Sequence, residues 1–195
     1  MISNALIRGV GITLLFLLAA GSPMAQAQDS AEKTFVSGGR IELQLEAGAY
    51  DVKPSSDNMI RVRCSSPEGT RVKVTLNTNG THADLRVSNT PHNNFHATIE
   101  VPAASDLTIR LTAGDLQIGA ITGNKDIALR AGNLDVKITD PNDYAHVEAS
   151  VNAGDVDASA FGGGASGLFR TFRWTGKGKY TIKARLMAGD VNLRK

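Results

Sequence analysis

Five short stretches of the chain repeat the same order of apolar and polar positions. Each reads apolar-x-Ala-Gly, then Asp or Asn, then apolar-x-apolar, except that Ala49 follows the first glycine. Apolar side chains occupy odd offsets before each glycine and even offsets after it. Because side chains along a straight strand alternate with a period of two, the chain must bend at the glycine. The predicted structural bends are Gly48, Gly114, Gly132, Gly154 and Gly189.

Two geometries explain such a bend. Glycine reaches positive φ without steric cost, and Asp or Asn tolerates a left-handed backbone and closes turns. The first geometry is a two-residue type II′ hairpin, and the second is a corner between successive strands of a β-solenoid. Successive glycines are 66, 18, 22 and 35 residues apart. The two short gaps fit a stacked array with about 20 residues per turn, but the local pattern leaves both geometries open.

The chain outside the bends also alternates with the period of a strand. No segment shows a sustained helical period. Asn79-Gly80 is a strong hairpin signal between two alternating runs, 71–76 and 83–87. We therefore predict an all-β fold, with a β-solenoid or β-helix-like repeat stack preceded by an antiparallel β-meander. The alternative is an antiparallel β-sandwich.

The first 27 residues have the composition of an export signal. An apolar run is followed by Ala25-Gln26-Ala27, which fits a small-residue cleavage site. This run is shorter than the about 20 residues that a membrane-spanning helix needs. We predict a cleaved signal peptide at 1–27, a flexible N-terminus at 28–35 and a single β-repeat domain at 36–195. The mature protein would be exported and soluble, in the periplasm or outside the cell.

The second half of the chain joins a Val-Pro dipeptide to successive Ala-Gly-Asp and Ala-Gly-Asn units. Val101-Pro102 is followed by the run from Leu107 to Ile118, which contains the second bend. This pattern resembles the bacterial putative-adhesin family with β-strand repeats, a domain of unknown function, over about residues 36–195. The resemblance implies a β-solenoid-like fold and, for most members, no assigned activity. The chain departs from the family in having Ala before every repeat glycine, where Ser or Thr is common.

Charge is uneven along the chain, although the formal net charge is only +2. Residues 161–195 contain eight Lys or Arg against one Asp, a net of +7. Clustered cations near aromatic side chains could form a face for envelope polysaccharide or lipid head groups. The alternative is that these cations fill the solvent side of strands. The candidate anionic-ligand face consists of Arg170, Arg173, Trp174, Lys177 and Lys179.

Other candidate chemistry has weaker support. His92 and His96 lie in a loop that enters a strand, so they do not share a helix face as metal ligands often do. The acids after the repeat glycines could stack, but the dense nonapeptide of calcium-binding β-rolls is absent. The sequence contains no P-loop, dinucleotide fingerprint, nucleophile elbow or zinc-protease motif. We therefore predict no catalytic residues, no metal site and no cofactor.

Three functional hypotheses follow from these features. The first is a non-enzymatic, exported β-repeat protein that serves as a structural or adhesin-like binding module of the cell envelope. The second is a binder of anionic glycans or lipid head groups through its basic C-terminal third. The third is a carbohydrate-active enzyme with paired carboxylates, which would need two acids within about 10 Å in a groove. Nucleic acid is not an expected partner of an exported chain without a nucleic-acid motif.

Overall fold

The computed structural model describes residues 30–195, so the predicted signal peptide lies outside the described residues. The structure is all-β, with 67% of residues in strands and two short 3₁₀ helices, η1 (Pro141–Asp143) and η2 (Ser159–Phe161). No helix in this part of the chain is long and apolar enough to cross a membrane. The strands are β1 (Ser30–Thr34), β2 (Arg40–Leu45), β3 (Ala49–Ser55), β4 (Met59–Ser65), β5 (Lys73–Asn79), β6 (His82–Ser88), β7 (His96–Pro102), β8 (Asp106–Ala113), β9 (Leu116–Ile118), β10 (Lys125–Ala131), β11 (Leu134–Lys137), β12 (Tyr144–Ala158), β13 (Gly163–Thr175), β14 (Tyr180–Ala188) and β15 (Val191–Arg194).

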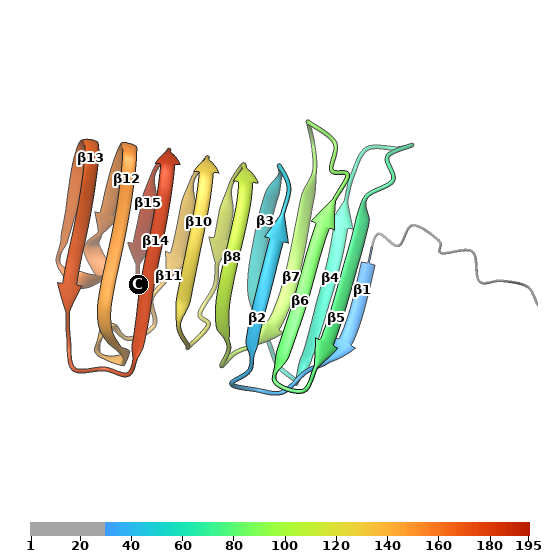
Figure 1. The fold of residues 1–195 in the computed structure, drawn as a ribbon, viewed down its shortest axis with the longest axis horizontal. Coiled ribbons are helices and arrows are strands. Elements are labelled where there is room, and N and C mark those ends of the chain that lie inside the picture. Colours follow the sequence, from blue (N-terminus) through green and yellow to red (C-terminus); the bar gives the residue numbers. More distant parts are fainter. Residues whose placement is uncertain (1–29) are drawn as a thin grey trace, which may run out of the picture.

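The strands form two layers that face each other across one apolar core (Figure 1). One layer has the order β5-β6-β2-β8-β10-β14-β12-β13, and the other has the order β1-β4-β7-β3-β9-β11-β15. Strand β12 belongs to both layers, because it pairs first with β14 and, beyond Gly154, with β15. At the other end β1 and β5 lie close together, so the sheet nearly closes on itself.

The predicted bends connect the two layers. β8 leads into β9, β10 into β11 and β14 into β15, and none of these strands pairs with the strand that follows it. Instead, β10 pairs in parallel with β8 and β14, while β11 pairs in parallel with β9 and β15. A type II′ hairpin is therefore not the geometry of these bends. The parallel pairing also differs from the antiparallel β-sandwich that the sequence left open.

The bend glycines stack directly on one another. Gly132 has a φ of 123°, and a Cβ atom on it would lie only 1.9 Å from the carbonyl oxygen of Gly114. A Cβ atom on Gly189 would lie 1.8 Å from the carbonyl oxygen of Gly132 in the same way. No side chain fits between such backbones, and L-residues rarely adopt this φ. The repeated glycine is thus required by backbone contact between neighbouring bends.

Side chains after the glycines link the same bends. Asn133 donates a hydrogen bond from Nδ2 to Asp115 Oδ1, at 2.9 Å. The backbone N–H of Asp190 donates to Asn133 Oδ1 at 3.4 Å, and that of Asp155 donates to Asp190 Oδ1 at 2.9 Å. Asp115, Asn133 and Asp190 each thus accept a hydrogen bond from a neighbouring bend.

One expectation for the N-terminal half is wrong. The Asn79-Gly80 hairpin does form and pairs β5 with β6. However, β4 pairs with β1 and β7 but not with β5, and β2 pairs in parallel with β6 and β8. An antiparallel β-meander therefore does not describe this region, because the chain crosses repeatedly between the layers and several neighbouring strands are parallel. Within the N-terminal segment expected to be flexible, Ser30–Thr34 forms β1 against β4.

The stacking order departs from the chain order at the C-terminus. β12 and β13 form an antiparallel pair at the end of the molecule, and the chain then returns through residues 176–179. β14 inserts between β10 and β12, and β15 inserts between β11 and the second half of β12. The last strands of the chain are therefore internal, and β13 is the terminal strand.

One charged side chain lies inside the core. Lys125 is 1% exposed, and its Nζ donates to the carbonyl oxygens of Ile121 and Gly123 at 2.7 and 3.1 Å. It also lies 3.0 Å from the hydroxyl of Tyr144. Burial lowers the pKa of Lys125 to about 8, opposed by the nearby negative charges of Asp106 and Asp143. Burial also raises the pKa of Tyr144 to about 12.

Candidate binding face

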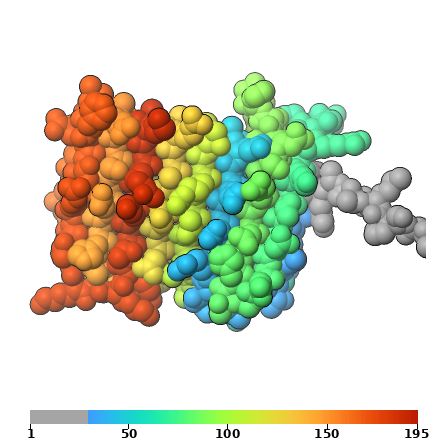
Figure 2. Space-filling view, viewed as in Figure 1, coloured from blue at the N-terminus to red at the C-terminus, as the bar shows by residue number. Residues whose placement is uncertain are grey.

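The basic residues predicted from the sequence lie at one end of the molecule, coloured orange to red in Figure 2. Arg170 and Arg173 are on β13, whereas Lys177 and Lys179 are in the connection to β14. All four are exposed. β13 pairs with β12 on one side, and among the described strands no other strand pairs with its opposite edge. Arg170 lies opposite the core residue Val151 of β12 and Arg173 lies opposite Glu148, so the two arginines leave opposite faces of this open edge strand.

The contacts of these cations are few. Arg173 Nη2 lies 3.8 Å from Glu148 Oε1, with 72% of the arginine side chain exposed. Arg170 Nε donates to the carbonyl oxygen of Ser166 at 2.8 Å. Such an exposed ion pair contributes little to stability, roughly 0–1 kcal/mol, so the fold depends little on these charges.

Trp174 has a different environment from the four cations. Its ring is half-buried and packs on Phe161, with 4.9 Å between ring centroids. It lies opposite Val147 of β12, on the row of side chains that points into the core. Trp174 therefore closes the end of the core, and its ring is not free to stack on a ligand as the sequence suggested.

Two large apolar side chains of β13 are exposed beside the cations. Leu168 is 67% exposed and Phe169 is 79% exposed. Phe169 has a φ of 50°, which is uncommon for a bulky residue, and it follows Gly167 with a φ of 106°. The strand is therefore distorted at its centre, where these two side chains project into solvent.

A second basic feature, which the sequence analysis did not predict, lies on the outer surface of the layer that contains β8, β10 and β14. Arg110 of β8, Arg130 of β10 and Arg185 of β14 line one groove of about 520 Å³. Their positions could have been found by aligning the repeats on glycine. Arg110 and Arg185 both stand four residues before a bend glycine, and Ala128 occupies the same position between them. Parallel, in-register strands place equivalent repeat positions side by side.

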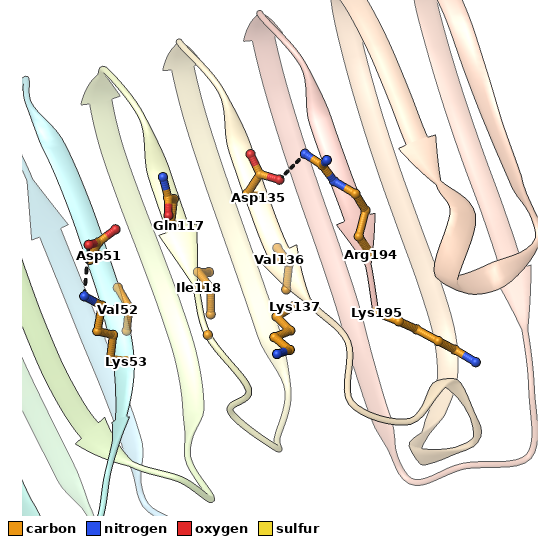
Figure 3. Close-up of a pocket in the computed structure, with 11 residues that line it drawn as sticks. Asp51, Val52, Lys53, Gln117, Ile118, Asp135, Val136, Lys137, Arg194 and Lys195 are labelled. Atoms are coloured by element: carbon orange, nitrogen blue, oxygen red, sulfur yellow. Dashed lines mark hydrogen bonds and ion pairs between the residues drawn. The ribbon is translucent and has the colours of Figure 1, made fainter.

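A depression on the layer that contains β3, β9 and β11 is lined by two aspartates (Figure 3). Paired carboxylates are what the hypothesis of a carbohydrate-active enzyme requires. It has a volume of about 390 Å³, and Asp51 and Asp135 lie on either side of Gln117. Asp51 forms an ion pair of 3.2 Å with Lys53, and Asp135 pairs with Arg194. Both acids therefore already have cationic partners on an open strand surface, unlike a general acid in an apolar pocket.

Among residues 30–195, one group of side chains could hold a metal ion. Glu42 of β2 lies beside Asp84 of β6, and His82 is two residues before Asp84 on the same strand. His82 Nε2 is 3.4 Å from Asp84 Oδ1 and 3.9 Å from Glu42 Oε1, and one ligand atom from each residue lies within 4.8 Å of the others. The three side chains are 38–56% exposed, so the group is an open surface cluster.

Comparison with known proteins finds a similar fold. A putative cell adhesion protein from Clostridium sporogenes matches 85% of this chain and 98% of its own, with 14% identity and a TM-score of 0.53. At this identity the likeness shows a shared fold alone. A putative adhesin from Parabacteroides distasonis matches 84% of this chain and 68% of its own at 14% identity, but its TM-score of 0.27 supports no argument. No family model and no curated protein matches the sequence.

Proposed function

We propose that this protein is an exported, non-enzymatic, adhesin-like module of the cell envelope that binds acidic polysaccharide. In this proposal residues 1–27 are a cleaved signal peptide, and 36–195 form one solenoid-like domain whose parallel, stacked bends make a rigid support. The resemblance to the putative-adhesin repeats and the fold shared with a protein described as a putative cell adhesion protein support an adhesin-like role.

The observation that supports ligand binding is the charge of the β13 end. Arg170, Arg173, Lys177 and Lys179 are each exposed on β13 or its connection to β14, and Glu148 is their only ion-pair partner among the described residues. Clustered, incompletely neutralised cations raise the local concentration of anions and speed their association. An edge strand rich in cations is also protected from pairing with other strand edges. Long anionic polymers suit this surface because they can contact several cations at once.

Absence of catalysis is part of the same proposal. The paired acids of a glycosidase need different surroundings, one of them apolar enough to keep its proton. Asp51 and Asp135 instead lie on the solvent side of β3 and β11 with Lys53 and Arg194 as partners. The proposal therefore assigns the depression of Figure 3 to surface ion pairing.

Binding of the mature protein to polygalacturonate tests this function, with neutral dextran as the negative control. We expect binding to polygalacturonate alone, weakening as salt rises from about 0.05 to 0.5 M because salt screens exposed charges. Reversal to Glu at Arg170, Arg173, Lys177 and Lys179 should abolish it.

A matched control reverses charges on the opposite layer, at Lys53 and Lys137. This control should bind like the wild type, because those lysines lie on β3 and β11, away from the β13 end. Equal binding by the wild type and the β13 variant would contradict the proposal. Binding to vesicles of anionic lipid, without binding to polygalacturonate, would replace the polysaccharide with a lipid surface.

A further inference from the structure

The groove between β8, β10, β14 and β12 has a floor and two walls set by the strand register. Ala128 lies between Arg110 on β8 and Arg185 on β14. Neighbouring strands are about 4.8 Å apart, so the backbones of the two arginines lie about 10 Å apart across the alanine. The short side chain of Ala128 leaves the floor open between two long cationic side chains. The groove therefore results from a small residue between two arginines of the same cross-strand row.

The charges around this groove are only partly neutralised. Arg110 Nη1 and Arg185 Nη2 lie 3.2 and 2.7 Å from the same oxygen, Oδ1 of Asp126. The third arginine, Arg130, is exposed and has no ion-pair partner among residues 30–195. Two guanidinium groups thus share one carboxylate, and the third has none. An anion entering the groove would meet a net positive charge, with Arg110 and Arg185 held in place by Asp126.

The remaining lining suits a sugar. Thr112, Ser150 and Asn152 supply hydroxyl and amide groups at the rim, and Met187 is 55% exposed beside them. Sugar rings combine hydroxyl groups with apolar C–H faces, which such a mixed lining can contact. Binding sites commonly combine apolar contact area with a few placed polar groups. Guanidinium groups bind carboxylates with two parallel hydrogen bonds, which a single lysine cannot do.

We propose that this arginine groove (Arg110, Arg130 and Arg185 around Ala128) is a specific subsite for a carboxylate-bearing sugar unit of an acidic polysaccharide. The inference rests on the proposed function and names a site separate from the β13 end. Arg130 and Arg185 bind the carboxylate, and Ala128 with Met187 contacts the ring. The β13 cations attract the polymer, whereas the groove recognises its acidic units.

Two variants test the groove without changing the β13 end. Arg130→Gln removes the arginine that has no ion-pair partner, and Ala128→Gln fills the floor without changing charge. Arg130→Gln should weaken binding to oligogalacturonate about tenfold, as expected for one charge-assisted contact. Ala128→Gln should also weaken it, because the longer side chain occupies the floor where the sugar would lie. Lys137→Gln, which removes a charge from the opposite layer, is the matched control and should bind like the wild type. Thermal unfolding of all three variants should match the wild type.

Different outcomes separate this inference from the proposed function. If both groove variants bind oligogalacturonate as tightly as the wild type, the groove proposal is wrong. The proposed function would then rest on the β13 end alone. No binding of the wild type to any acidic polysaccharide overturns both. If Ala128→Gln weakens binding to dextran sulfate and to oligogalacturonate by the same factor, the subsite is not specific for carboxylates. We expect Ala128→Gln to lose more affinity for oligogalacturonate than for dextran sulfate or inorganic phosphate.

Discussion

The stacked bends and the β13 end are both glycine-rich, but Gly162, just before β13, has surroundings opposite to those of the bend glycines. A Cβ atom on Gly132 or Gly189 would collide with the backbone of the next bend, whereas one on Gly162, just before β13, would meet nothing within 4 Å. The polar side chains differ in the same way. Asp190 bonds a neighbouring bend, whereas Arg170 and Arg173 face solvent.

This difference separates the residues that build the fold from those available for binding. A repeated motif in a stacked structure is fixed by contact with its own copies, because each repeat packs on its neighbours. Side chains of a terminal strand have no such neighbour on one side. The five bends therefore explain the architecture, and the candidate ligand contacts lie on β13 and on the outer surface of the larger layer.

The largest effect is expected at a bend. Gly132→Ala should lower the free energy of unfolding by about 4 kcal/mol or more, because the new Cβ atom would lie 1.9 Å from the Gly114 carbonyl oxygen at a φ of 123°. Urea denaturation of the variant measures this loss directly. Failure of the variant to fold would be the extreme form of the same result.

Gly162→Ala is the matched control for this substitution. Gly162 also has a positive φ, 76°, but its Cβ atom would meet open space. We expect a loss of roughly 1–2 kcal/mol, the cost of left-handed backbone alone. Similar losses at Gly132 and Gly162 would show that φ, not stacking, explains the repeated glycine.

The buried Lys125 should make stability depend on pH. Its pKa falls from 10.5 to about 8 on folding, so between these values the unfolded chain binds more protons than the native protein. The stability contributed by this group should therefore rise as pH increases through this window, by about 3 kcal/mol in total. The difference in unfolding free energy between the wild type and Lys125→Met, measured from pH 7 to 10.5, isolates the effect. A flat difference would mean that Lys125 keeps its ordinary pKa in the folded protein.

The hydrogen bonds between bends should matter less than the glycines. Asp190→Ala removes the acceptor of the Asp155 N–H, and we expect a loss of about 1 kcal/mol. Glu68→Ala, at an exposed acid in the loop before β5, is the control and should be neutral. Chemical denaturation measures the free energy of unfolding of both variants. Equal values would show that the acids of the bends do not contribute to stability.

The smallest effect on stability is expected at the β13 end. Reversing Arg170 and Arg173 to Glu should change the unfolding free energy by less than about 0.5 kcal/mol, because exposed charges contribute little. Thermal unfolding of the double variant measures this. A large loss would show that the β13 cations are part of the fold, which would remove the contrast with the bends.

Some of this structure follows from the sequence because its causes are local. The change of apolar offsets at Gly114 or Gly132 predicts a bend, and Asn79-Gly80 predicts the hairpin that pairs β5 with β6. In both cases the residues that determine the geometry are adjacent in the chain. The same argument predicts which side chains point inward along each strand.

Other features depend on contacts between distant segments and leave no local signal. β14 lies between β10 and β12, out of chain order, and strands of similar apolar pattern carry no local signal of which neighbour they pair with. The sequence therefore did not predict the strand order, and it missed how the N-terminal strands are divided between the two layers. Lys125 was missed because its partners, Ile121, Gly123 and Tyr144, are carbonyl and hydroxyl groups that no charge pattern reveals.

The candidate ligand residues were predicted in part. The four basic residues are exposed on β13 and on its connection to β14, but their grouping as a ligand face stays a prediction. Trp174 packs on Phe161 because it lies opposite the core residue Val147. The arginine groove was missed because Arg110 and Arg185 are 75 residues apart in the chain and meet only through strand order.

One paired measurement tests the separation of folding from binding most directly. The variant with Glu at Arg170, Arg173, Lys177 and Lys179 is compared with the wild type for both melting temperature and affinity for polygalacturonate. We predict an unchanged melting temperature together with lost binding, because these side chains contact solvent and not the stacked bends. A variant that melts like the wild type and binds polygalacturonate with the same affinity would contradict the account.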